Sequence, residues 1–191
     1  QAYVLPKVLG DYEPEICPPP AYTGTWYKWY PTGRLKAKVE YRQGIFRGMR
    51  RLYHPNGQLG CEEPYVIDGK MHGDVLGWYE SGTLKSKQRV AFNVPHGPFQ
   101  TYYESGKVKS SGWYVNGQKV GLWEDFDAQG NIVRREWFLY DKQASPEEYA
   151  KASRVDKSLP KYPLKRPSEM IRQNDEDIGK ENMTEAPGDG E

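Results

Sequence analysis

Few side chains in this chain could carry out acid–base or metal chemistry. The histidines are His54, His72 and His96, and the cysteines are Cys17 and Cys61. His72 and His96 each precede a glycine at equivalent points of a repeated unit, which places them roughly 10 Å apart on a sheet. No cysteine or carboxylate column completes a set of metal ligands beside them. We therefore interpret both as solvent-facing turn residues.

Motifs of catalysis are also missing from the sequence. It contains no glycine-rich phosphate loop, no nucleophile elbow and no Cys-His motif. Its scattered carboxylates are of the kind that solvated strands and turns carry. The sequence predicts no enzyme activity, no catalytic residue, no metal and no cofactor.

Two groups of residues are suited to contacts with another protein. Tyr30, Tyr79 and Tyr103 each follow another aromatic residue, and tyrosine is favoured at interfaces because its apolar ring has a polar tip. Their alternative is contact with a flank of the same chain. Four arginines cluster in one stretch and would meet the carboxylates of a partner: Arg42, Arg47, Arg50 and Arg51.

Other ligands are less favoured. Arginines beside aromatic rings can hold single-stranded nucleic acid, but the formal net charge is only +1 and the last residues are acidic. Exposed Trp and Tyr rings could instead bind a glycan, which remains an alternative. No apolar run has the length of a membrane span, so we expect membrane association only through partners.

These residues belong to a unit that recurs five times. Glycines mark the period: Gly24, Gly48, Gly73, Gly97 and Gly121, followed nine residues later by Gly33, Gly57, Gly82, Gly106 and Gly130. Between them stands one aromatic column, namely Trp29, Tyr53, Trp78, Tyr102 and Phe126, and after it an aliphatic one, namely Leu35, Leu59, Leu84, Val108 and Ile132. A steady period of this kind is typical of repeat arrays. Each unit is predicted to form two short strands and two tight turns.

Aromatic residues are expected on both faces of the resulting sheet. We interpret the first aromatic column as an internal ladder that holds the repeats in register. A second column closes each unit: Tyr41, Tyr65, Val90, Tyr114 and Phe138. Because successive strand residues face opposite sides, adjacent pairs such as Trp29-Tyr30 put rings on both faces. One face must then be covered by a flank of the chain or by a partner.

The pattern G-x-W-x-x-Y-x-x-x-G-x-L, followed by an aromatic residue and N-G, resembles the MORN-variant repeats. Its best copies run from Gly24 to Leu35 and from Gly97 to Gly117, and the resemblance covers about residues 22–141. It is similar in particular to bacterial MORN-repeat proteins often labelled antitoxin components. The resemblance implies a repeat scaffold and brings no catalytic residues with it.

The flanks differ from the repeats. Residues 1–21 are rich in proline and predict an extended arm, whereas residues 142–191 predict a short helix at about 146–153 and then a low-complexity charged tail. The predicted fold is all-β, an open antiparallel meander of about ten short strands in residues 22–141, between this arm and a largely irregular tail.

The first residue, Gln1, bears on the compartment. It suggests removal of a signal peptide, so we expect export to a periplasm or cell envelope; an organelle or the cytoplasm are the alternatives. Cys61 stands in a column of mostly small residues and is interpreted as a structural thiol, ahead of a bridge to Cys17.

The expected function is that of a non-catalytic repeat scaffold for protein–protein interaction, as a peripheral subunit of a larger assembly. The alternatives are an antitoxin-like protein that neutralises a toxin and a glycan-binding module.

Overall fold

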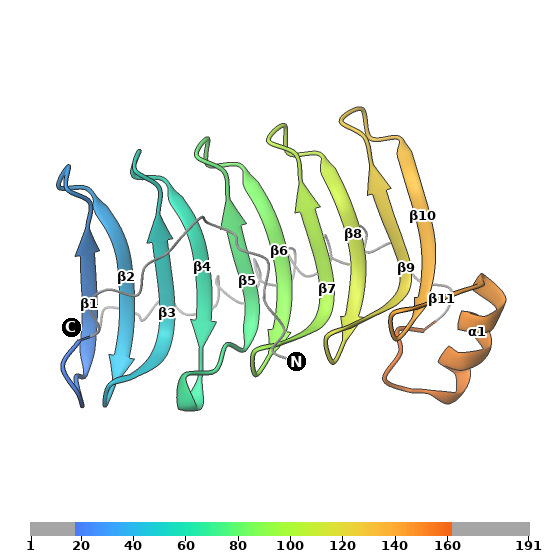
Figure 1. Ribbon diagram of the computed structural model, residues 1–191, viewed down its shortest axis with the longest axis horizontal. Helices are drawn as coiled ribbons and strands as arrows, with labels where there is room; N and C mark the ends of the chain where they lie inside the picture. Colours follow the sequence, from blue (N-terminus) through green and yellow to red (C-terminus); the bar gives the residue numbers. More distant parts are fainter. Residues whose placement is uncertain (1–17, 162–191) are drawn as a thin grey trace, which may run out of the picture.

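The protein forms one open sheet of antiparallel strands. The computed structural model describes residues 18–161, and in it eleven strands pair in the order of the sequence (Figure 1). The strands are β1 (Gly24–Trp29), β2 (Leu35–Arg42), β3 (Ile45–Tyr53), β4 (Leu59–Tyr65), β5 (Gly73–Trp78), β6 (Leu84–Ala91), β7 (Val94–Tyr102), β8 (Val108–Val115), β9 (Gln118–Phe126), β10 (Ile132–Leu139) and β11 (Lys142–Ala144). The predicted all-β meander is confirmed.

Two kinds of turn alternate along the array. In the turn inside each repeat, the second glycine column adopts a positive φ, as at Gly33 (80°), whose N–H donates to the carbonyl of Tyr30 at 2.9 Å. In the turns between repeats, Gln43-Gly44 and Asn116-Gly117 both have positive φ at both positions, which suits a two-residue hairpin. A short 3-10 segment, η1 (Ile67–Gly69), joins β4 to β5. The turn residues read from the sequence therefore place the hairpins correctly.

The C-terminal end of the sheet is covered by two further elements. After β11, Ser145 caps the helix α1 (Pro146–Val155) with a capping box that Glu148 completes. This helix was predicted two residues too short at its end. The eleventh strand was not predicted, because its three residues carry no repeat signal.

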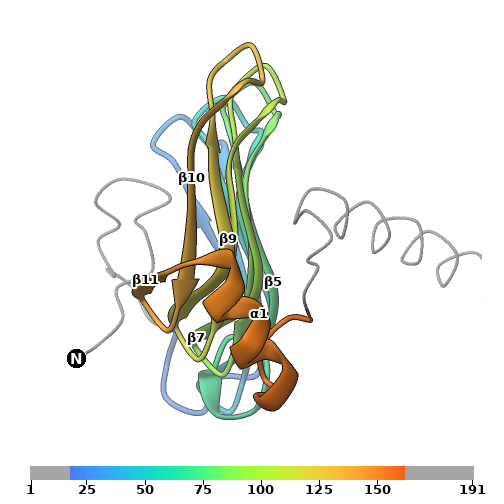
Figure 2. The same cartoon turned by 90° about the vertical axis from the view of Figure 1, so that its right-hand side faces the viewer.

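The strand pairing gives the sheet two distinct faces. We call the side that carries Trp26, Val39, Tyr41, Phe99 and Trp123 the aromatic face, and the opposite side the helix face. On the helix face, Tyr149 of α1 is fully buried against Val115 and Val120, with its ring 5.3 Å from that of Trp137. Figure 2 shows the sheet edge-on as a single layer, with α1 packed at its C-terminal end.

A second small core lies at the other end, on the aromatic face. It contains Ala37, Val39, Leu52 and Cys61, and Cys61 is a free thiol that is only 2% exposed. Its interpretation as a small structural residue is confirmed, while Cys17 lies outside the described residues. So do most of the predicted arm and the charged tail.

The one α-helix in residues 18–161 is too short and too polar to cross a bilayer.

Candidate interaction surfaces

Side chains from the turns inside the repeats link each repeat to the next. The hydroxyls of Tyr30, Tyr79 and Tyr103 donate to the backbone carbonyls of Tyr53, Tyr102 and Phe126, at 2.7, 2.7 and 2.8 Å. His54 occupies the same place in the second repeat, where its Nε2 lies 2.9 Å from the carbonyl of Trp78. We call these four residues the turn ladder. It provides hydrogen-bond partners for the backbone carbonyls of the last residues of β3, β5, β7 and β9.

The turn ladder also carries a row of lysines. Lys36, Lys85 and Lys109 place their Nζ atoms 5.5, 5.5 and 5.7 Å from the ring centres of Tyr30, Tyr79 and Tyr103. Cations at this distance from an aromatic face are attracted to it. The ladder tyrosines thus have partners for both ring and hydroxyl within the chain. Their contact with another protein remains a prediction.

Removing one ladder hydroxyl should weaken the coupling between repeats. We expect Tyr79→Phe to lower the free energy of unfolding by about 1 kcal/mol, because the carbonyl of Tyr102 loses its donor. Urea unfolding followed by Trp fluorescence would measure it. Tyr27→Phe is the matched control, since Tyr27 is an exposed tyrosine outside the ladder. Equal effects of the two substitutions would contradict a structural role for the ladder.

The first aromatic column is less internal than expected. Trp29 is 58% exposed and stacks on Tyr27, with ring centres 6.4 Å apart and planes at 25°, while the other four members are partly buried. The prediction of an internal ring ladder is therefore wrong for Trp29. The link between repeats comes from the turn ladder, which uses the backbone carbonyls of this column.

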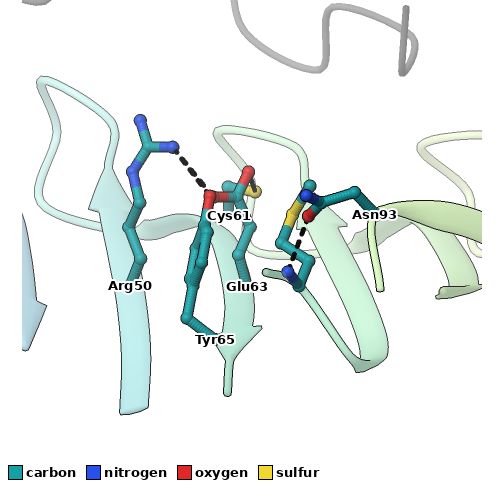
Figure 3. Close-up of polar contacts among 6 residues, drawn as sticks. Arg50, Cys61, Glu63, Tyr65 and Asn93 are labelled. Carbon is teal, nitrogen blue, oxygen red and sulfur yellow. Dashed lines mark hydrogen bonds and ion pairs between the residues drawn. The ribbon is translucent and has the colours of Figure 1, made fainter. Parts of the chain in front are cut away.

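Arg50 belongs to a polar cluster on the aromatic face. Its Nη1 lies 2.9 Å from Glu63 Oε2 and 3.5 Å from the hydroxyl of Tyr65, which itself donates to Glu63 at 3.1 Å. Figure 3 shows these side chains beside Cys61, whose Sγ is 3.7 Å from Glu63 Oε1. Burial, reinforced by the charge of Glu63, raises the pKa of Cys61 and of Tyr65 to about 12 each. Neither group ionises near neutral pH, so the cluster offers no nucleophile.

Arg51 points to the other face from the adjacent position of β3. It pairs with Glu62 across the strands, with Nη2 3.3 Å from Oε1. Arg50 and Arg51 therefore do not form one continuous basic patch, and each already has a carboxylate partner. Whether either contacts a second protein remains a prediction.

Arg47 has a different environment. With Arg42 it lines a cavity of about 290 Å³ between the turn after β2 and the segment η1. The remaining lining residues are Gln43, Ile45, Phe46, Val66 and Asp68. Both arginines are exposed and Ile45 is 47% exposed, so apolar and cationic groups meet at one accessible hollow. We call it the Arg47 pocket.

Aromatic rings pack closely along the aromatic face on both sides of the polar cluster. Near the N-terminal end, Phe46 lies between Tyr41 and Tyr65 at 4.9 and 5.1 Å. In the C-terminal half, Trp123 contacts Phe99, Tyr114 and Phe138 at 5.5, 5.0 and 6.5 Å. Lys119 covers this second cluster, with Nζ 4.5 Å from the Trp123 ring centre. The second aromatic column of the sequence thus supplies packing for this face.

Two of the histidines lie in exposed positions near turns. His72 and His96 are exposed, as predicted; His72 packs on Phe92 at 4.8 Å, and His96 Nδ1 lies 3.3 Å from Asn116 Oδ1. Within residues 18–161, no group of three His, Cys, Asp or Glu side chains is arranged to hold a metal ion. His54 was missed as a ladder member, although it stands 24 residues after Tyr30.

Comparison with known families agrees with the repeat architecture. Three segments, residues 22–43, 71–89 and 95–116, match the model of the MORN repeat variant, and they correspond to the first, third and fourth repeats. Such repeats are commonly interaction or scaffold modules and are generally non-enzymatic. No curated protein matches the chain.

Proposed function

We propose that this protein is a non-catalytic scaffold that binds another protein through the Arg47 pocket, as a peripheral subunit of a larger assembly. The observation that carries the proposal is the meeting of two exposed arginines with the exposed Ile45 and the half-buried Phe46 and Val66 in one hollow. The other arginines of this stretch are already paired with Glu62 and Glu63. Arg42 and Arg47 outnumber the single carboxylate of the pocket, Asp68.

The chemistry of the pocket points to an acidic partner segment. An aspartate or glutamate could pair with Arg47 in the bidentate manner that guanidinium groups favour. An apolar neighbour of that residue would pack on Ile45 and Phe46. Apolar contact surrounded by charged groups is a usual arrangement at protein interfaces.

The remainder of the sheet supports the pocket as a rigid platform. The turn ladder and the aromatic clusters connect successive repeats from β1 to β10, so a partner would meet a preformed surface. Preorganisation reduces the entropy lost on binding. Export is part of the proposal and would bring the protein to a partner in the cell envelope.

Charge reversal at the pocket tests this function. We expect Arg47→Glu to reduce recovery of the native partner in mild affinity purification by roughly tenfold or more, since a charged interface contact is lost and replaced by repulsion. Lys142→Glu on β11 carries the same charge change at the far end of the sheet and should leave recovery unchanged. A photo-crosslinking residue at Ile45 should capture the partner, whereas one at exposed Val155 should not.

Other results would overturn the proposal. Unchanged recovery with Arg47→Glu, or crosslinks at Val155 alone, would exclude the pocket as the contact. A small toxic protein as the captured partner would favour the antitoxin alternative. A lone protein whose Trp fluorescence shifts with oligosaccharides would favour glycan binding.

A further inference from the structure

Within the described residues 18–161, strand β1 forms an edge of the sheet, and some of its backbone groups face away from β2. Tyr22 accepts from Gly44 N–H and Tyr30 donates to the carbonyl of Arg34, so even-numbered residues of this segment turn their backbone groups toward β2. Because the direction alternates along a strand, Thr25, Tyr27 and Trp29 direct theirs away from the sheet, and of these groups the Thr25 carbonyl accepts from the hydroxyl of Tyr22 at 2.9 Å. Within residues 18–161, β2 is the one strand that pairs with β1.

The opposite, C-terminal end of the sheet is less suited to pairing with another strand. Its edge strand, β11, has three residues and is accompanied by α1. At the ladder position of the last repeat stands Asp127, whose carboxylate accepts from Gln129 N–H and Asn131 N–H in its own turn at 2.9 and 2.8 Å. The ladder position of the last repeat therefore carries a side chain that bonds within its own turn and does not reach forward to a further repeat. Head-to-tail stacking of copies is disfavoured at this end.

The sequence of β1 is complementary to itself in antiparallel pairing. Centring the pairing on Tyr27 places Tyr27 opposite its own copy and Thr25 opposite Trp29. The same register sets Lys28 opposite Trp26, so each cation faces an indole ring and no like charges meet. Shifting the centre to Lys28 would instead oppose two lysines.

The exposed side chains of β1 fit this arrangement. Tyr27 is 47% exposed and Trp29 is 58% exposed, and they stack on one another on the helix face of the sheet. Exposed aromatic residues on an unpaired edge are a typical feature of strands that accept another strand. The pairing would cover them from both copies at once.

We propose that two copies of this chain join through β1 in an antiparallel, two-fold pairing centred on Tyr27. The two sheets become one continuous sheet, with the Arg47 pocket present once in each half. A two-fold contact of this kind is closed, so it stops at a dimer.

Charge substitutions at Tyr27 test the register as well as the dimer. In analytical ultracentrifugation, the wild-type chain should sediment as a dimer, and Tyr27→Lys and Tyr27→Glu alone should each raise the dissociation constant roughly 30-fold or more. An equimolar mixture of the two variants should restore the dimer, because Lys and Glu then meet at the two-fold axis. Phe92→Lys, at an equally exposed aromatic residue between β6 and β7, should leave the dimer intact.

The fold can be monitored separately. Circular dichroism spectra should be unchanged in these variants, because Tyr27 is exposed and its outward backbone groups do not contribute to the pairing with β2. Melting temperatures should agree when wild type and variants are compared at protein concentrations below the dissociation constant, where all are monomers. A wild-type monomer at about 100 μM would overturn the proposal, since an affinity that weak falls short of a stable dimer. A dimer that survives either single substitution, or a mixture that stays monomeric, would overturn it too. None of these readouts depends on the Arg47 pocket or on its partner.

Discussion

We expect Gly112→Ala to be among the most destabilising single substitutions in the repeats. A methyl group at Gly112 would lie 2.3 Å from Cδ2 and Cε2 of Trp123, far inside van der Waals contact. The indole cannot move away easily, because Phe99, Tyr114 and Phe138 pack around it. Overpacking of this severity should lower the free energy of unfolding by about 3 kcal/mol.

The measurement is urea unfolding of Gly112→Ala beside a matched glycine substitution. Gly130→Ala is the control, because Gly130 has a φ of 97° but no heavy atom within 4 Å of an added Cβ. Strain alone should cost that variant about 1 kcal/mol. A loss from Gly112→Ala no greater than that of Gly130→Ala would show that Trp123 is mobile and that the cluster is not a rigid part of the platform.

The repeat pattern does not predict the packing role of Gly112. The second glycine column and pairs such as Asn116-Gly117 predicted the turns, because a tight hairpin requires positive φ and glycine provides it, whereas the first glycine column lies within strands. Gly112 belongs to neither column, and its role arises from Trp123 on the next strand. A register shift between Ser111 and Trp113 brings the two residues together, and strand alternation alone does not locate such a bulge.

The turn ladder was hidden in the sequence for a different reason. Tyr30, Tyr79 and Tyr103 do not form a complete aromatic column, because the second repeat has His54 and the last has Asp127 in their place. The common property is a side chain that can bond a backbone group, not an aromatic ring. A column defined by hydrogen-bonding capacity would have included His54. Its Nε2 lies 2.9 Å from the Trp78 carbonyl, in the same way that each ladder tyrosine donates to a carbonyl of the next repeat.

Strand alternation predicts which face each arginine of β3 lies on, but not which residues it contacts. The arginines were predicted to form one cluster, although alternation along β3 places Arg50 and Arg51 on opposite faces. Their carboxylate partners follow only from the register of β3 with β4, which pairs Arg50 with Glu63 and Arg51 with Glu62. The Arg47 pocket depends on the position of η1, whose Asp68 is left-handed at φ 61°, and nothing in the repeat pattern predicts that contact.

Alkaline pH should destabilise the protein, and the buried Cys61 should contribute more to this loss of stability than a solvent-exposed thiol would. Burial and the neighbouring Glu63 raise the pKa of Cys61 from 9.0 to about 12 in the folded state. Below about pH 9 both states keep the proton, so stability is unaffected there. Above it the unfolded chain releases the proton first, and the free energy of unfolding falls by roughly 3 kcal/mol by about pH 11 from this group alone. Tyr65, with its pKa also raised to about 12, adds to the loss.

The proton count separates Cys61 from the other groups that titrate at high pH. Urea unfolding under reducing conditions, repeated from about pH 8 to pH 11, gives the slope of stability against pH and hence the protons released on unfolding. In Cys61→Ala that number should be about one lower above pH 9, because alanine cannot ionise. Ser86→Ala changes the equivalent small residue of the third repeat, which has no thiol, and should keep the wild-type slope. Identical slopes for wild type and Cys61→Ala would mean that the thiol is reached by solvent and that the cluster around Glu63 opens readily, which would remove it from the rigid part of the aromatic face.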